Sequence, residues 1–207
     1  MYVPPHAREE RSEVLHGAID EIAFGTLATV AGGAPVLTHL PMLRTAVGER
    51  GTIVGHVSRA NPQWRDASGT RAVAAFVGPS FYVSPNVYPT KRETGRVVPT
   101  WNYIAVQAYG TIEFFDEPAR LHDLVRSLTD RHEATQPAPW SVEDAPAEYI
   151  DGQLRGIVGF ALSIERLVGA WKFSANKAEA DRAGVAALMR GSNDPAIRGL
   201  AMRPLGA

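Results

Sequence analysis

The chain has no cysteine among its 207 residues. Disulfide bonds, thiolate nucleophiles and zinc sites with thiolate ligands are therefore excluded. Its six histidines also lack the spacing of a metal site, because no two of them form a His-x-x-x-His pair on one helix face. The sequence predicts no metal centre.

An excess of charge of one sign is lacking as well. The chain has 21 basic and 22 acidic residues, which gives a formal net charge of −1. Broad nucleic-acid binding depends on Lys and Arg neutralising phosphates, so direct DNA binding is possible but unsupported. No apolar run approaches the roughly 20 residues of a membrane helix, and we see no signal peptide. We expect a cytoplasmic protein without membrane contact.

The chain also lacks a glycine-rich dinucleotide- or mononucleotide-binding motif after any expected strand. What the chain does contain is many short β-rich segments, with a hydrophobic content of 45% that is enough for a core. We expect strands at 25–30, 35–41, 52–58, 71–77, 104–115 and 157–165. Helical spacing predicts helices at 9–23, 117–132 and 177–190, with the latter two as appendages of one domain over 1–207. This pattern predicts a mainly antiparallel β-barrel with flanking helices.

Several boundaries are predicted from turn and breaker residues. Residues 44–50 are expected to form a polar loop, and Gly78-Pro79 to end the strand that begins at Arg71. We treat 167–174 as a β-like stretch separate from 157–165, and 191–207 as a fading tail. Gly110 is expected to mark a kink or bulge in a long strand.

The stretch 55–64 (GHVSRANPQW) combines a strand end with a hydroxyl, a guanidinium and an amide. Ser58, Arg59 and Asn61 precede Pro62, a residue favoured at the start of a helix. Such a strand end is a plausible anion socket, since Arg presents a planar fork and a helix terminus has spare N–H groups. The alternative is a solvated Arg beside an ordinary helix cap.

Two histidines and an aromatic cluster are further candidates. His39 and His56 each interrupt an apolar strand, so they are either core histidines with backbone partners or part of a pocket wall. Trp101 and Tyr103 flank Asn102, which is typical either of a core anchor or of a shelf for a flat ligand. The stretch 171–177 (WKFSANK) ends a strand with two Lys residues, either facing an anion or solvated.

Five motifs in series resemble the PaiB-like family of FMN-binding negative transcriptional regulators. They are MYVPPH at 1–6, GHVSRANPQW at 55–64, FVGP at 76–79 with YVSP at 82–85, VPTWNY at 98–103, and KFSANK at 172–177. The resemblance spans nearly the whole chain. It implies an FMN-binding split barrel, related in fold to pyridoxamine-phosphate oxidases, that forms a homodimer with FMN at the subunit interface.

The resemblance also implies roles for individual residues. Ser58, Arg59 and Asn61 would hold the FMN phosphate, and His56 would stand near the same wall. The residues that would line the isoalloxazine from the second strand are Thr38, His39, Leu40 and Pro41. The residues that would close the pocket or complete the ring and phosphate contacts are Trp101, Asn102, Lys172, Ser174 and Asn176.

Two functions are compatible with these residues. The first is a PaiB-type negative transcriptional regulator that binds FMN. The second is an FMN-dependent oxidoreductase, in which the flavin carries the hydride chemistry and the protein supplies orientation. No acid–base dyad is evident, so the sequence indicates no catalytic residue and leaves enzymatic activity open.

Overall fold

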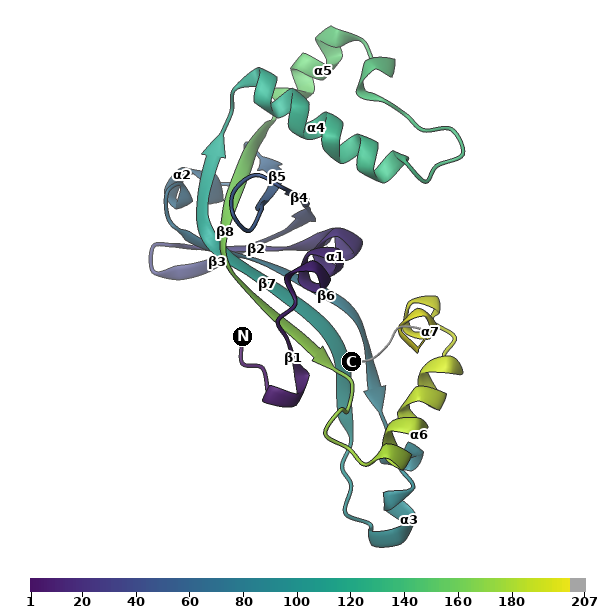
Figure 1. Ribbon diagram of the computed structural model, residues 1–207. Coiled ribbons are helices and arrows are strands. Elements are labelled where there is room, and N and C mark those ends of the chain that lie inside the picture. The colour runs from purple at the N-terminus through teal and green to yellow at the C-terminus, as the bar shows by residue number, and fades with distance from the viewer. Residues whose placement is uncertain (202–207) are drawn as a thin grey trace. The chain divides into compact units, whose positions relative to one another are not determined.

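The structure, a computed structural model, describes residues 1–201 (Figure 1). Its strands form one sheet in the order β3-β2-β6-β7-β8-β5-β4, with β1 paired to β8. Every pair whose register is resolved is antiparallel. The strands are β1 (Arg8–Glu9), β2 (Phe24–Ala31), β3 (Ala34–Pro41), β4 (Leu43–Thr45), β5 (Thr52–Ser58), β6 (Arg71–Val83), β7 (Thr100–Phe115) and β8 (Ile157–Lys172).

Seven α-helices and three short 3₁₀ turns connect or flank these strands in the described residues. The helices are α1 (Ser12–Ile22), α2 (Gln63–Ala67), α3 (Thr90–Thr94), α4 (Pro118–Glu133), α5 (Ala147–Leu154), α6 (Glu179–Arg190) and α7 (Pro195–Ala201). The 3₁₀ turns are η1 (Pro5–Ala7), η2 (Pro85–Val87) and η3 (Val142–Asp144). None of these helices is long and apolar enough to cross a membrane. The mainly β architecture with flanking helices is therefore confirmed.

The described residues divide into two compact units. The first comprises 1–15, 77–106 and 168–201, and the second comprises 16–76 and 107–167. In the first, α6 and α7 bury Val185, Met189 and Leu200 in one apolar cluster with the ends of β6 to β8. In the second, α4 and α5 pack a separate apolar cluster against the sheet. The predicted single domain over 1–207 stays a prediction.

The β2–β3 hairpin forms because its turn has suitable residues. Gly32 and Gly33 have φ values of 58° and 78°, as a two-residue turn with both central residues at positive φ requires. Alternation then places Leu27 and Leu40 in the core of the second unit, where both are nearly fully buried. Pro35 and Pro41 lie near the two ends of β3, which forms one end of the sheet path.

Gly110 is required by close packing between strands. A Cβ atom there would lie 1.8 Å from the carbonyl oxygen of Ser163, so no larger residue fits. The long strand β7 thus has a glycine at the expected place, and the reason is the approach of β8.

Several predicted boundaries are wrong, and most errors come from local breaker signals that tertiary pairing overrides. Gly78 and Pro79 do not end β6, which continues to Val83. The pairing with β2 covers only 73–75, so the missing N–H of Pro79 removes no hydrogen bond from that ladder. The stretches 157–165 and 167–174 belong to one strand, β8, up to residue 172. The expected loop at 44–50 contains the end of β4, which pairs with β5.

Two terminal predictions also change. The helix expected over 9–23 begins only at Ser12, because Arg8 and Glu9 pair with β8 as strand β1. The expected tail contains helix α7, whose Ile197 and Leu200 are buried. The rest of that expected tail, 202–207, lies outside the described residues.

Candidate functional site

The anion-socket stretch forms a tight turn between β5 and α2. The side-chain oxygen of Asn61 accepts a hydrogen bond from the backbone N–H of Gln63 at 3.0 Å, and the backbone N–H of Asn61 donates to the Ser58 carbonyl at 2.9 Å. Helix α2 begins at Gln63 rather than at Pro62 and has five residues, so its dipole is small. Any anion here would depend on side chains more than on the helix terminus.

The guanidinium of Arg59 is hydrogen-bonded to other groups of the protein. Its Nε donates to the Arg155 carbonyl at 2.8 Å, and one terminal nitrogen donates to the Ile157 carbonyl at 3.2 Å. The other terminal nitrogen donates to a carboxylate oxygen of Asp116 at 3.2 Å. All three guanidinium nitrogens thus bond to the segment just before α4 or to the segment just after α5. The phosphate-binding role of Arg59 stays a prediction, with few donors left to fulfil it.

Ser58 and Asn61 retain donors. The Ser58 oxygen accepts from the backbone N–H of Ala60 at 3.3 Å, which leaves its hydroxyl proton available. The Asn61 nitrogen donates one hydrogen bond, to the hydroxyl of Thr38 at 2.9 Å, and has a second hydrogen. The structure therefore brings together Thr38 and Asn61, two predicted site residues 23 positions apart.

The four predicted residues of β3 divide between the two faces of the sheet. Leu40 is buried in the core, and Thr38 is on that same face, half-buried. His39 and Pro41 are on the opposite face, where the Nδ1 atom of His39 lies 2.9 Å from the hydroxyl of Thr26. Side chains of these four residues cannot all touch one ligand ring, although backbone groups of β3 could do so.

The face of the hairpin that carries His39 has no charged residue. The strand register pairs its members as Phe24 with Pro41, Thr26 with His39, Ala28 with Leu37 and Val30 with Pro35. We call these eight residues the outer hairpin face. Phe24, Val30 and Leu37 are each between 57% and 59% exposed, a large apolar exposure for one sheet face.

His56 is half-buried on β5, opposite Gly159 of β8. Its Nδ1 atom is buried without a hydrogen-bond partner among the described residues. Burial lowers the pKa of His56 below its ordinary value of 6.5, because the charged form loses solvation. The ring is therefore neutral at pH 7.

In the first unit, Trp101 and Asn102 face opposite sides of β7. Trp101 is 57% exposed and meets Tyr82 edge to face, with ring centroids 6.2 Å apart. Asn102 is fully buried, and its oxygen accepts from the hydroxyl of Ser174 at 3.2 Å. Its amide nitrogen has no partner among the described residues, and Ser174 has a left-handed φ of 60°. An unpartnered buried amide and a strained backbone together are typical of binding sites.

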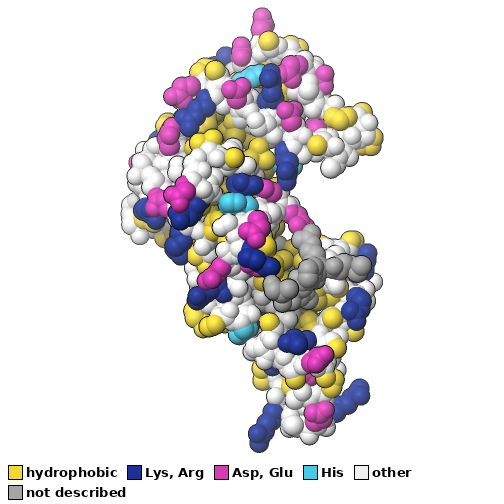
Figure 2. Space-filling model, viewed as in Figure 1, with side chains coloured by type: hydrophobic (Ala, Val, Ile, Leu, Met, Phe, Trp, Pro, Cys, Tyr) yellow, Lys and Arg dark blue, Asp and Glu magenta, His cyan; other side chains and the backbone are white. Residues whose placement is uncertain are grey.

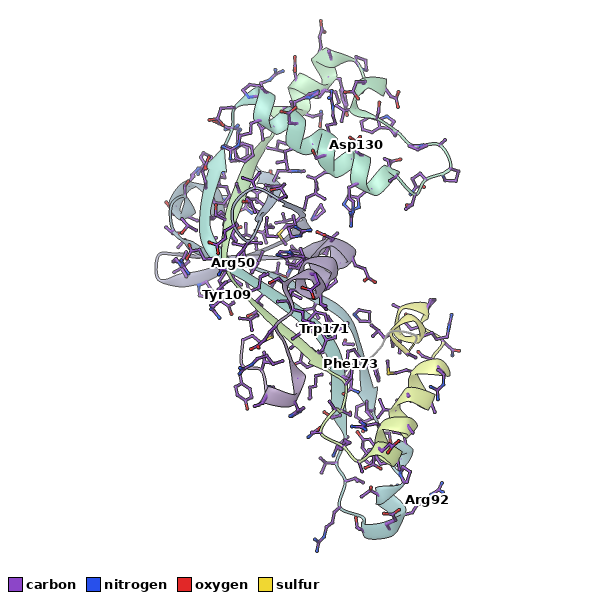
Figure 3. All side chains as sticks on the ribbon, in the orientation of Figure 1. Arg50, Arg92, Tyr109, Asp130, Trp171 and Phe173 are labelled. Atoms are coloured by element: carbon purple, nitrogen blue, oxygen red, sulfur yellow. The ribbon has the colours of Figure 1, made fainter. Side chains whose placement is uncertain are left out.

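Lys172 ends β8 between Trp171 and Phe173, both labelled in Figure 3. Its ammonium nitrogen donates to the Thr100 hydroxyl at 3.0 Å and lies 5.8 Å from the centroid of the Tyr103 ring. The described residues contain no ion pair of Lys172, so its charge is available. Asn176 is exposed in the turn that follows.

The predicted site residues thus form two groups. Thr38 to Pro41, His56, Ser58, Arg59 and Asn61 belong to the second unit, and Trp101, Asn102, Lys172, Ser174 and Asn176 belong to the first. Convergence of the two groups on one ligand stays a prediction. The sequence does not single out Thr26 or the buried Gln63, because the type of either residue does not reveal whether its side chain makes a structural contact or is solvated.

Comparison with known proteins identifies the family. The sequence profile described as "Putative FMN-binding domain" matches residues 1–166. The chain belongs to this FMN-binding family. It is also 31% identical over 202 residues to the Bacillus subtilis (strain 168) protein named "Protease synthase and sporulation protein PAI 2", covering 97% of this chain and 95% of that one. The resemblance to the PaiB-like family is therefore confirmed.

Solved structures confirm the split-barrel fold. The FAD and heme binding protein from Mycobacterium smegmatis superposes with a TM-score of 0.62 at 19% identity, covering 86% of this chain and 79% of that one. The flavocytochrome Anf3 from Azotobacter vinelandii superposes with a TM-score of 0.59 at 13% identity, covering 88% of this chain and 78% of that one. At these identities the likeness establishes the fold. The family assignment supports FMN as the cofactor of this chain.

Proposed function

We propose that this FMN-binding split-barrel protein is a PaiB-type negative transcriptional regulator, with the flavin held between β3 and the β5–α2 turn. The observation that carries the placement is the 2.9 Å hydrogen bond between Asn61 and Thr38. It joins the two segments for which family resemblance implies phosphate and ring contacts. The match of the family profile to residues 1–166 supports the cofactor.

The donor groups of this turn fit an oxyanion. The Ser58 hydroxyl and the second Asn61 hydrogen can each donate to a phosphate oxygen, since neither has a partner among the described residues. Arg59 contributes little to this set of donors, because its three guanidinium nitrogens bond protein oxygens and Asp116 at 3.2 Å partly offsets its charge. When bound, FMN supplies a ring that accepts electrons or hydride; the residues here bind and orient it.

The outer hairpin face supports a homodimer. Exposed Phe24, Val30 and Leu37 share this face with no charged side chain, a composition more typical of the buried centre of an interface than of a solvated surface. We propose that a second copy covers this face and that the flavin, held across β3 from the Asn61 side, lies at the edge of the resulting interface. His39, fixed by Thr26, would be the polar group that the face offers to the flavin.

Direct DNA contact receives less support from the surface. On the face that Figure 2 shows, basic and acidic side chains are interspersed, and no broad patch of one sign is seen. Helices α6 and α7 follow one another closely, but both place residues in the apolar cluster of the first unit, and Asp194 caps the start of α7. An acidic residue at that terminus disfavours phosphate contact. We therefore propose that regulation acts through the flavin or a partner protein.

A flavin titration tests the proposal. Quenching of flavin fluorescence should show saturable binding of FMN with one flavin per chain, and light scattering should give the mass of a dimer. Riboflavin, which lacks the phosphate, should bind more weakly. A chain that neither quenches FMN nor acquires flavin absorbance would refute the proposal. Anaerobic reduction of the bound flavin by a nicotinamide donor would instead favour the oxidoreductase.

A further inference from the structure

A buried glutamine joins the β2–β3 hairpin to the predicted phosphate turn. Gln63 is 1% exposed, and its side-chain nitrogen donates to the Thr29 hydroxyl at 3.0 Å and to the Val36 carbonyl at 3.2 Å. Its side-chain oxygen accepts from the Thr38 hydroxyl at 2.6 Å. Thr38 in turn accepts from the Asn61 amide at 2.9 Å. One chain of hydrogen bonds therefore runs from the core to Asn61.

The direction of each hydrogen bond in this chain is fixed by backbone groups. The Val36 carbonyl can only accept, so the Gln63 nitrogen must face it and the Gln63 oxygen must face Thr38. An amide oxygen also only accepts, so Thr38 gives its single hydroxyl proton to Gln63. The Thr38 oxygen is then left to accept from Asn61.

The hydrogen bonds of Asn61, at the other end of this series, have the same direction. The Asn61 oxygen accepts the backbone N–H of Gln63 at 3.0 Å, which places the Asn61 nitrogen toward Thr38. Thr38 consequently has no proton to donate to a ligand. Asn61 has one N–H hydrogen without a partner among the described residues, and its amide cannot rotate to present the oxygen without breaking bonds at both ends.

We propose that Gln63 and Thr38 are positioning residues that hold the Asn61 amide as a donor, so that this site selects a ligand through an acceptor oxygen. The inference rests on the proposed function in taking FMN as that ligand. FMN offers two kinds of acceptor, the phosphate oxygens and the ring carbonyls. A comparison of FMN with riboflavin distinguishes them, because riboflavin keeps the carbonyls and lacks the phosphate.

The first test measures flavin affinity in a double-mutant cycle. Thr38→Val removes the link between Gln63 and Asn61 at nearly constant volume, and Thr38→Ser is the matched control that keeps the hydroxyl. The dissociation constant for FMN should rise about fivefold in Thr38→Val, the effect of one ordinary hydrogen bond, and stay near the wild-type value in Thr38→Ser. In an Asn61→Ala background, Thr38→Val should have no further effect, because Asn61 is its only route to the ligand.

The second test uses flavin-free protein and NMR. The side-chain amide hydrogens of Gln63 should exchange with solvent far more slowly than those of the exposed Gln153. Thr38→Val should speed the exchange of the Gln63 amide and shift the side-chain amide resonances of Asn61. Thr38→Ser should leave both unchanged. These signals need no bound flavin, so they report the hydrogen-bond chain by itself.

The outcomes separate this inference from the proposed function. Failure of the wild type to bind FMN, with a protected Gln63 amide, would refute the proposed function and leave the hydrogen bonds that hold the Asn61 amide intact. Normal FMN binding in Thr38→Val, or an equal loss of affinity in the presence and absence of the Asn61 amide, would overturn the positioning role. If Thr38→Val weakens FMN and riboflavin equally, the acceptor is a ring carbonyl; if it weakens FMN alone, the acceptor is the phosphate.

Discussion

Arg59 should matter more to folding than to flavin binding. Its guanidinium bridges two backbone carbonyls, of Arg155 and Ile157, and the carboxylate of Asp116. Each carbonyl hydrogen bond contributes about 1 kcal/mol, and the ion pair contributes less than about 1 kcal/mol because the Asp116 side chain is 63% exposed. Arg59→Ala should therefore lower the free energy of unfolding by about 2–3 kcal/mol.

Thermal unfolding provides the measurement. In a chain of this size, each kcal/mol moves the melting temperature by about 2–4 °C, so Arg59→Ala should lower it by about 5–10 °C. Asp116→Asn removes only the exposed ion pair and should lower it by a third of that or less. Arg65→Ala is the matched control, because Arg65 is exposed on α2 and the one contact of its guanidinium within residues 1–201 is a cation–π contact with Trp64.

Flavin affinity completes the experiment. Below the melting temperature, the ratio of the dissociation constants for riboflavin and FMN isolates the contribution of the phosphate. This ratio should be nearly unchanged in Arg59→Ala, because the guanidinium is already bonded to protein oxygens. An unchanged melting temperature together with a collapsed ratio would refute this reasoning and restore Arg59 to the phosphate socket.

Three further predictions follow from single positions. Because burial lowers the pKa of His56 below 6.5, the unfolded chain takes up a proton first as the pH falls. The stability measured by calorimetry should then decline as the pH falls through 6.5, the ordinary value of a histidine in the unfolded chain, and less steeply in His56→Gln. Gly110→Ala should destabilise by about 3 kcal/mol in urea unfolding, because its Cβ would meet the Ser163 carbonyl oxygen, whereas Gly17→Ala on α1 has open space and should not destabilise. Leu37→Glu on the outer hairpin face should give a monomer in light scattering and weaken FMN binding, and a dimer with normal FMN affinity would contradict the proposed interface.

Element types were largely predictable because hydrophobic periodicity is local. The strand expected at 52–58 has the observed bounds, and the helix expected at 117–132 differs from α4 (Pro118–Glu133) by one residue at each end. The failures occur where distant pairing overrides a local signal. Pro79 lies within β6 outside its pairing with β2, and Arg8 and Glu9 form β1 because they pair with β8. Neither circumstance can be inferred from neighbouring residues.

The candidate site was predictable in its location and less so in its chemistry. The motif at 55–64 and the strand at 35–41 do meet, through Asn61 and Thr38. What the sequence could not indicate is which donors are already used. The acceptors of Arg59 at positions 155 and 157 lie nearly 100 residues away along the chain. The hydrogen-bond partners of Gln63 depend on the register of the β2–β3 hairpin, which precedes the motif at 55–64 in the sequence.

Proline at both ends of β3 has a consequence for the behaviour of the protein during synthesis. A strand at the edge of a sheet has unpaired N–H and C=O groups, so it can pair with a strand of another molecule before the native assembly forms. Pro35 and Pro41 lack the N–H groups such a misplaced strand would need, so only the short segment between them can template it. The protein can thus expose the apolar outer hairpin face to a proposed second copy, while the two prolines limit the addition of further strands to the edge of β3.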